Sequence, residues 1–294
     1  MKKISSNKIK IIAIVGATAS GKTKYSIDLA KQTDGEIISA DSRIVFKGFD
    51  IAAAKPTKEE MCGVPHYMIS IVEPTFDYSA GLYKKQAQKI IADISSRGKT
   101  PIIVGGTGLY TDILLKGYDL PEMEPDKILR EKLNNFTSDE LYIKLKEVDN
   151  VGAMTIDKND KKKLIRALEI VILTGKQLSE VRGKSKSEYE VEWIGKNFER
   201  DILYERINKR VDLMLEQGII DETKNLLDKY GRIYNITNTI GYREIIQYLD
   251  GKLSLGESVE LLKKNTRNYA KRQLTWFRKN PDIKWDIYPE KLYK

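Results

Sequence analysis

The hydrophobic and polar positions in the first third of the chain predict strands that alternate with helices. Short runs rich in isoleucine and valine are typical of strands buried on both faces, and between them lie longer stretches in which apolar residues recur at helical spacing. The predicted strands are 9–15, 36–40, 66–72 and 101–104, and the predicted helices are 20–32 and 79–96. This alternation indicates an α/β fold with a parallel sheet.

The pattern changes after Gly117, where lysine and glutamate become dense and strand signals fade. Helical spacing predicts 126–135, 138–148 and 160–174, and 175–190, rich in lysine, serine and glycine, is expected to be a mobile loop. A short strand at 191–194 then precedes helices at 201–217, 219–230, 242–249 and 256–279. We expect a helical insertion domain at 118–190 within a catalytic core made of 1–117 and 191–294.

Composition excludes several kinds of chemistry. The chain has 294 residues, a formal net charge of +9, one cysteine and one histidine. Cys62 alone can form neither an internal disulfide nor a multi-cysteine zinc site, and a single histidine excludes mechanisms that need two imidazoles. We interpret His66 as structural and Cys62 as a small side chain near a turn. No apolar stretch is long enough to span a membrane, so a cytoplasmic protein without membrane contact is expected.

Residues 16–23, GATASGKT, match the phosphate-loop pattern G-x-x-x-x-G-K-[ST] without a mismatch. The segment follows a predicted strand and opens a predicted helix, where backbone amides and the helix dipole converge on phosphate. The expected phosphate-binding residues are Gly16, Ala17, Thr18, Ala19, Ser20, Gly21, Lys22 and Thr23. Lys22 would neutralise phosphate charge and the Thr23 hydroxyl would bind Mg²⁺. The motif alone leaves open whether the phosphates belong to a nucleotide.

Two polar residues follow other predicted strands and should face the same edge of the sheet. Asp41 comes after the strand at 36–40, and Thr107 follows the strand at 101–104. Ligands of parallel α/β sheets collect at the carboxyl ends of the strands. Asp41 can therefore serve as a general base or as a water-mediated magnesium ligand, although an aspartate here can equally cap a turn. Thr107 has the same two interpretations.

Basic residues concentrate near the carboxyl end of the chain. The segment 263–279 has seven lysines and arginines and no acidic residue. On a helix, the basic residues Lys264, Arg267, Lys271 and Arg278 share one side, and an apolar stripe is formed by Ala270, Leu274 and Phe277. Because balancing glutamates are missing, contact with an RNA backbone is favoured over a merely solvated face. Smaller basic clusters occur at 161–166 and at Arg206 with Arg210.

Several segments, taken in order, resemble the bacterial tRNA dimethylallyltransferases, also called tRNA isopentenyltransferases. The matching segments are 16–23, 39–43 (SADSR), 54–56 (AKP), 64–66 (VPH), 105–110 (GGTGLY), 166–169 (RALE), 240–244 (IGYRE) and 266–278 (TRNYAKRQLTWFR). The resemblance covers nearly the whole chain. It implies a P-loop kinase-like core, a helical insertion that clamps the anticodon stem-loop, and carboxyl-terminal helices that also bind tRNA.

The resemblance also implies the reaction. A dimethylallyl group passes from dimethylallyl diphosphate to the exocyclic N6 amine of the adenosine on the 3′ side of the anticodon, position 37. The phosphate loop would hold the donor diphosphate with Mg²⁺ at Thr23, the aspartate at the position of Asp41 would accept the amine's proton, and Thr107 would contact the substrate. The adenine must leave its stack to reach such a pocket. We expect the enzyme to act as a monomer.

The residues expected to contact tRNA come from all parts of the chain. They are Asp41, Ser42, Arg43, Ile44, Thr107, Arg130, Lys163, Arg166, Arg206, Arg210, Arg267, Lys271 and Arg272. Two of them depart from the family pattern: Ile44 stands where the family often has glutamine, and Lys163 stands where it has arginine. Both positions belong to tRNA recognition rather than to donor chemistry. At Lys163, lysine cannot reproduce the bidentate contacts of arginine.

Three other functions remain open at this point. A small-molecule phosphotransferase, such as a nucleoside or nucleotide kinase, would share the core but would leave the basic carboxyl-terminal helix unexplained. A prenyltransferase acting on free AMP would need neither that helix nor the insertion. An RNA-binding module without catalysis would not need Lys22, Thr23 and Asp41, which are all present.

Overall fold

The computed structural model describes residues 8–118, 123, 125–181 and 187–288. The chain forms two compact units. One unit consists of Met1–Leu115 and Glu188–Lys294, and the other is the continuous segment Lys116–Ser187. These boundaries differ by a few residues from the 118–190 expected for the insertion. Within the described part of the chain, no helix is both long enough and apolar enough to cross a membrane.

A six-stranded parallel sheet organises the larger unit. Its spatial order is β3-β2-β4-β1-β5-β6, and its strands are β1 (Ile9–Gly16), β2 (Gly35–Ser39), β3 (His66–Tyr67), β4 (Thr100–Gly105), β5 (Tyr189–Phe198) and β6 (Lys284–Tyr288). All five neighbouring pairs run parallel. The predicted α/β class is confirmed. Because β1 lies between β4 and β5, the residues that follow it emerge at the centre of the sheet's carboxyl edge.

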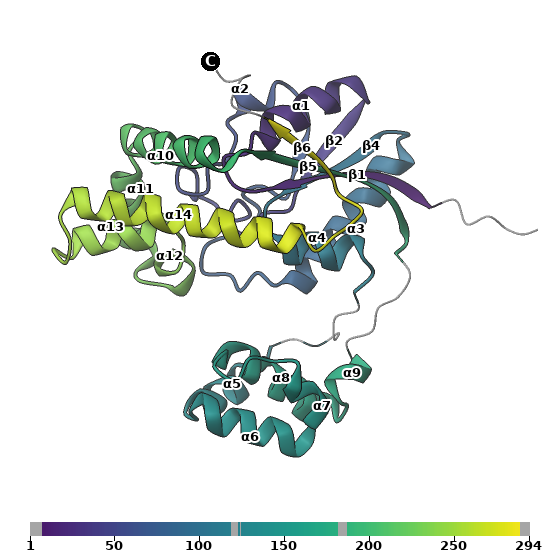
Figure 1. Ribbon diagram of the computed structural model, residues 1–294, viewed down its shortest axis with the longest axis vertical. Helices are drawn as coiled ribbons and strands as arrows, with labels where there is room; N and C mark the ends of the chain where they lie inside the picture. Colours follow the sequence, from purple (N-terminus) through teal and green to yellow (C-terminus); the bar gives the residue numbers. More distant parts are fainter. Residues whose placement is uncertain (1–7, 119–122, 124, 182–186, 289–294) are drawn as a thin grey trace, which may run out of the picture. The chain divides into compact units, whose positions relative to one another are not determined.

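Helices cover both faces of this sheet (Figure 1). One face carries α1 (Lys22–Gln32), and the other carries α3 (Ala80–Ser96) and α4 (Gly108–Leu115). Alternate side chains of β1 point to opposite faces, so Ile14 packs with Ile27 and Ala30 of α1 in a buried cluster. Burial of this apolar surface holds α1 in place directly after the phosphate loop.

The carboxyl-terminal helices form a second group beside the sheet (Figure 1). They are α10 (Arg200–Glu216), α11 (Ile219–Tyr230), α12 (Tyr234–Thr237), α13 (Tyr242–Leu249) and α14 (Leu255–Phe277). Val211, Ile219, Ile245 and Leu262 bring four of these helices into one core. The long helix α14 begins with a capping box between Ser254 and Glu257, which satisfies amides that the first turn leaves unpaired.

The smaller unit consists of short helices around a core of its own. These helices are α5 (Lys127–Asn134), α6 (Ser138–Val148), α7 (Asn150–Met154), α8 (Lys161–Thr174) and α9 (Leu178–Val181). Leu141 and Leu145 of α6 pack against Leu164 and Leu168 of α8, and all four are buried. The buried carboxylate of Asp149 accepts hydrogen bonds from two backbone amides. Gly152, in α7, donates to one oxygen, and Leu178, the first residue of α9, donates to the other.

Several predicted element boundaries are wrong. The strand expected at 66–72 ends at Tyr67, because Met68 and Ser70 have positive φ angles (65° and 52°) that extended backbone does not adopt. Val72 keeps only an isolated bridge to Phe46. The short helices α2 (Lys58–Met61), α4, α7, α9 and α12, together with β6, were not predicted.

The loop expected at 175–190 is also partly wrong. It contains α9, and Tyr189 already belongs to β5, which is longer than the predicted strand 191–194. Residues 182–186 lie outside the described residues. The strand was underestimated because its exposed and buried residues alternate only at its start, before a run that is buried on both faces.

Glu36, at the start of β2, has a buried carboxylate that is paired with several basic and polar groups. It accepts hydrogen bonds from Arg97 (2.6 Å at both oxygens) and Tyr67 (2.8 Å), and Lys99 lies 3.1 Å away. The hydrogen bonds from Arg97 lower the pKa of Glu36 from 4.5 to about 2.

We expect the substitution Glu36→Gln to lower the free energy of unfolding by about 2 kcal/mol at neutral pH. Since the folded pKa is depressed, this stabilisation is complete above the unfolded pKa of 4.5 and is lost as the pH falls towards 2. Urea unfolding at neutral and acidic pH measures the free energies of unfolding of both proteins, and the exposed Glu190→Gln is the matched control. If the difference between wild type and Glu36→Gln stays constant down to about pH 3, the carboxylate of Glu36 is not the source of the stabilisation.

Candidate active site

The phosphate loop, residues 16–23, connects β1 to α1 at the centre of the sheet's carboxyl edge. Gly16 has φ 149° and Gly21 has φ 81°, both in the region that favours glycine. A Cβ on Gly16 would lie 2.1 Å from the Lys196 carbonyl oxygen of the neighbouring strand β5. Glycine is therefore required where the loop leaves the sheet.

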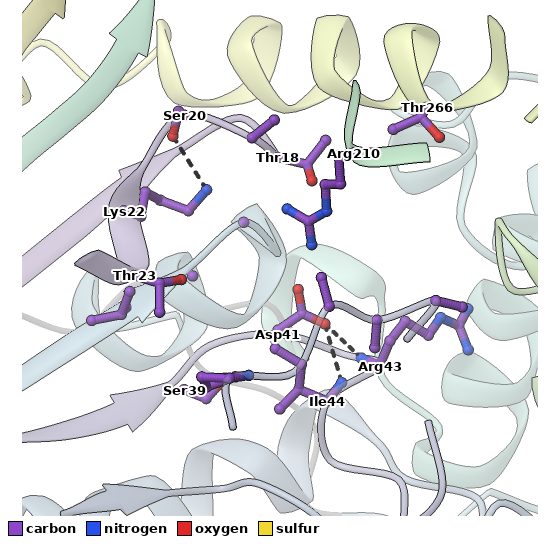
Figure 2. Close-up of a pocket in the computed structure, with 18 of the residues that line it drawn as sticks. Thr18, Ser20, Lys22, Thr23, Ser39, Asp41, Arg43, Ile44, Arg210 and Thr266 are labelled. Atoms are coloured by element: carbon purple, nitrogen blue, oxygen red, sulfur yellow. Dashed lines mark hydrogen bonds between the residues drawn. The ribbon is translucent and has the colours of Figure 1, made fainter. Parts of the chain in front are cut away.

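Lys22 reaches across the inside of this loop (Figure 2). Its Nζ donates to the Ala17 carbonyl oxygen at 2.5 Å and to Ser20 Oγ at 3.4 Å. Burial of the ammonium, together with the positive charge of Arg210, lowers the pKa of Lys22 to about 7, and Asp41 partly opposes both effects. An anion bound beside Nζ would favour the charged form, so this site gains electrostatic attraction when phosphate arrives.

Two arginines of α10 border the phosphate loop. The Arg210 side chain points into the cavity towards Asp41 (Figure 2), and burial lowers the pKa of Arg210 while Asp41 raises it. Arg206 Nε donates to the Ala19 carbonyl oxygen at 2.8 Å, and its guanidinium lies 4.4 Å from the centre of the Phe198 ring. Both residues were expected to contact tRNA, and the structure places both next to the phosphate loop.

Asp41 follows β2 and faces Arg210 across the cavity (Figure 2). One carboxylate oxygen, Oδ1, accepts hydrogen bonds from the backbone amides of Arg43 at 2.7 Å and Ile44 at 3.3 Å. The turn-capping role considered from sequence is therefore present. Oδ2 has no hydrogen bond to any other residue in the described ranges, so the carboxylate can cap the turn and still offer one oxygen to a ligand.

Thr107 ties two of the turns at the sheet edge together. Its Oγ1 accepts from the Ser42 amide at 3.1 Å, and its own amide donates to the Ala40 carbonyl oxygen at 3.2 Å. Tyr269, on α14, has its side chain close to Thr107, and burial raises the pKa of Tyr269. The turn after β4 is thus held against the turn that carries Asp41.

These elements enclose one cavity of about 1000 Å³, at the upper end of the range for small-molecule sites. Of the residues predicted for the site, the cavity is lined by Thr18, Ala19, Ser20, Gly21, Lys22, Thr23, Asp41, Ser42, Arg43, Ile44, Arg206, Arg210 and Arg272. Gly16, Ala17, Thr107, Arg267 and Lys271 do not line it. The apolar part of the wall comes from Ile37, Ala52, Ala53, Ile69 and Val104, among others.

Other lining residues were missed or interpreted differently from sequence. His66 and Cys62, interpreted as structural, both line the cavity. His66 Nδ1 is 2.8 Å from the Val64 carbonyl oxygen and therefore donates to it, and burial lowers the pKa of this imidazole. Tyr269 and Gln273 of α14 were missed as site residues, because the sequence shows the helix but not which of its sides faces the sheet edge.

Helix α14 is less uniformly basic than the sequence indicated. Ala270 and Phe277 of the predicted stripe are buried, but Lys263 pairs with Asp212 (2.9 Å) and Glu260 (3.3 Å), which lie outside the basic segment. Arg267 donates to Asn208 Oδ1 at 2.6 Å. Lys271 and Arg272 are exposed. Exposed charge on α14 therefore remains at Lys264, Lys271 and Arg272.

In the smaller unit, a buried carboxylate positions two of the predicted arginines. Glu169 is fully buried and accepts from Arg130 at both oxygens (2.8 Å each) and from Arg166 at 2.5 Å. Lys163 pairs with Asp160 at 2.7 Å in the first turn of α8. The side chains of Arg130 and Arg166 remain 40% and 32% exposed, so each retains surface for an anionic partner.

A phosphate loop at the carboxyl edge of a parallel sheet, closed over by helices, defines a P-loop enzyme of the kinase-like α/β class. Two family profiles match this chain. The profile described as IPP transferase covers residues 44–280, and the profile described as isopentenyl transferase covers residues 9–73. The chain belongs to the IPP transferase family, which confirms the resemblance inferred from its sequence segments.

Relatives and solved structures agree with this assignment. A tRNA dimethylallyltransferase of Thermoanaerobacter sp. is 48% identical, with 94% of this chain and 91% of the relative covered. The crystal structure of the tRNA isopentenylpyrophosphate transferase from Bacillus halodurans is 43% identical with a TM-score of 0.73, covering 96% and 91%. A eukaryotic dimethylallyltransferase acting on tRNA is 30% identical with a TM-score of 0.85, covering 97% and 75%.

The lowered pKa of Lys22 predicts how ligand affinity changes with pH. Above about pH 7 the amine is increasingly neutral, so binding a diphosphate ester must take up a proton. Affinity for dimethylallyl diphosphate should fall as the pH rises from about 7 to 9, by at most about tenfold per unit. Calorimetric titrations at several pH values measure this affinity, and Lys22→Arg, whose guanidinium stays charged, is the matched control. Equal pH profiles for both proteins would contradict the prediction.

Proposed function

We propose that this protein transfers the dimethylallyl group of dimethylallyl diphosphate to the N6 amine of adenosine 37 in tRNA. The observation that carries the proposal is one cavity in which a phosphate loop faces the carboxylate of Asp41, in a chain of the IPP transferase family. A phosphate loop alone fits many donors, but a carboxylate opposite it supplies the acceptor side of a transfer reaction.

The phosphate side of the cavity fits a diphosphate leaving group. An allylic C–O bond ionises readily when the departing diphosphate is stabilised by fixed positive charge. Lys22 and Arg210 line the cavity beside the phosphate loop, at the start of α1. In this arrangement the C1–O bond of the donor breaks, diphosphate carries away the electron pair, and the loop holds the product until release.

Magnesium is expected to accompany the diphosphate. The Thr23 hydroxyl and the Asp41 carboxylate both line the cavity, and among the described residues no cluster of three or more histidine, cysteine or acidic residues occurs. This donor set fits Mg²⁺, which keeps several waters and takes most other ligands from substrate phosphates, and it does not fit a protein-caged metal. Bound there, the ion would neutralise charge that develops on the diphosphate.

The acceptor side uses the free oxygen of Asp41. As the N6–C1 bond forms, the amine becomes cationic, and its proton passes to Asp41 Oδ2. The backbone amides of Arg43 and Ile44 hold Oδ1, which keeps the carboxylate oriented. Since Asp41 lines the cavity, the adenine must be flipped out of the anticodon loop to reach it. Ile44 contributes an apolar surface to this part of the cavity, where glutamine would read a base edge.

The basic residues outside the cavity are proposed to bind the tRNA backbone. Arg130, Lys163 and Arg166 would do so in the smaller unit, and Arg267 and Lys271 on α14, together with Arg272, which also lines the cavity. Arg206 and Arg210 are better assigned to the donor side, since they border the phosphate loop. A tRNA substrate supports a cytoplasmic location.

The direct test is incubation with Mg²⁺, labelled dimethylallyl diphosphate and an unmodified anticodon stem-loop with three adjacent adenosines, followed by mass analysis of the nucleosides. A mass gain of one dimethylallyl group on one adenosine is expected. A gain on free AMP with none on the stem-loop would indicate an AMP prenyltransferase. Phosphate transfer from ATP with no prenylated product would indicate a small-molecule kinase.

Asp41→Asn should separate catalysis from tRNA binding. The amide oxygen of asparagine can still accept from the Arg43 and Ile44 amides, but the side chain cannot accept the proton. We expect kcat to fall by about 10²- to 10⁴-fold while the Kd for tRNA changes less than about twofold. Single-turnover assays and filter binding measure the two quantities. Turnover within about threefold of the wild type would remove Asp41 as the base.

A further inference from the structure

Gln273 of α14 joins two segments of the sheet edge through one side-chain amide. Its Oε1 accepts from the Thr18 backbone amide at 2.8 Å, and its Nε2 donates to the Gly106 carbonyl oxygen at 2.9 Å. Thr18 lies in the phosphate loop after β1, and Gly106 lies in the turn after β4. The side chain is only 6% exposed, so both hydrogen bonds are shielded from water.

The bonded peptide of the phosphate loop also positions Lys22. The amide of Thr18 and the carbonyl of Ala17 belong to the same peptide unit. Gln273 holds its N–H, and Lys22 Nζ donates to its carbonyl oxygen. Since a peptide unit is planar, fixing the N–H direction fixes the carbonyl direction as well. Gln273 therefore orients the group that holds the lysine ammonium inside the loop.

The surroundings of Gln273 allow only one orientation of its amide. Its two partners are a donor and an acceptor, so a flipped amide would place donor against donor and acceptor against acceptor. A Cβ on Gly106 would lie 2.2 Å from Gln273 Nε2, so the glycine makes room for this contact. One turn further along α14, Trp276 Nε1 donates to Asp112 Oδ2 at 3.0 Å, which anchors the helix to α4.

We propose that Gln273 is a positioning residue that holds the phosphate loop in its diphosphate-binding conformation. The proposal rests on the proposed function, because it assigns the loop to the donor diphosphate. Gln273 does not touch the reacting atoms. It keeps the peptide between Ala17 and Thr18 in the orientation that aims Lys22, and it fixes the loop to the rigid helix α14, so the loop's amides need not be ordered when the ligand arrives.

The first test uses Gln273→Met, which keeps the side-chain length and removes both hydrogen bonds. The probe is inorganic pyrophosphate with Mg²⁺, and the readout is its Kd by calorimetry. We expect pyrophosphate to bind about tenfold more weakly, while the Kd for the anticodon stem-loop changes less than about twofold. Thr275→Ala, an exposed position on the same helix, is the matched control and should leave both values unchanged. Thermal melting identifies the folded fraction of each variant.

A second variant keeps the test decisive if Gln273→Met does not fold. In Gln273→Glu the protonated carboxylic acid can accept from Thr18 and donate to Gly106, whereas the carboxylate cannot donate. Burial favours the protonated form of this carboxyl. The ratio of the variant's pyrophosphate Kd to that of the wild type should therefore approach one as the pH falls from about 8 to about 5.5.

The outcomes separate this inference from the function beneath it. Weaker pyrophosphate binding with intact stem-loop binding, and recovery of Gln273→Glu at low pH, supports positioning by Gln273. Unchanged pyrophosphate binding in a folded Gln273→Met, or an equal loss of both affinities, overturns it. Wild-type protein that binds no pyrophosphate overturns the donor site itself, and the positioning role with it.

Discussion

Close backbone contact between neighbouring strands, where the sheet ends, is the constraint on which the site depends. A Cβ on Gly105 would lie 2.1 Å from the Ala40 carbonyl oxygen, and one on Gly16 would lie 2.1 Å from that of Lys196. Glycine at these two points lets four strands, β2, β4, β1 and β5, finish side by side. The turns that follow them are then near enough for Thr107, at one turn, to hold the segment that carries Asp41, at the next.

Local signals in the sequence predicted the parts of this arrangement that depend on neighbours along the chain. The buried runs of β1, β2 and β4, the phosphate loop and the polar residues after each strand were all visible as short patterns. Asp41 illustrates the limit of such signals. Its sequence position allowed either a turn cap or a base, and the structure assigns the cap to one oxygen and leaves the other towards the cavity.

The remaining features depend on contacts between distant segments. Gln273 stands in a predicted helix, but its partners Thr18 and Gly106 are more than a hundred residues away, and no periodicity identifies them. Arg210 was predicted to contact tRNA, because its spacing with Arg206 does not show that α10 borders the phosphate loop. Strand β6 was missed because it is short and gains its burial only from pairing with β5.

The strand order has a consequence for how the chain folds during synthesis. The central strand β1 pairs along its whole length with β5, which follows the entire smaller unit in sequence. One edge of β1 is therefore unprotected while residues 116–187 are being made, and an unpaired strand edge invites association with other chains. The smaller unit is continuous and can complete its own core first. The exposed edge of β1 is covered only once β5, made after the smaller unit, has joined the sheet.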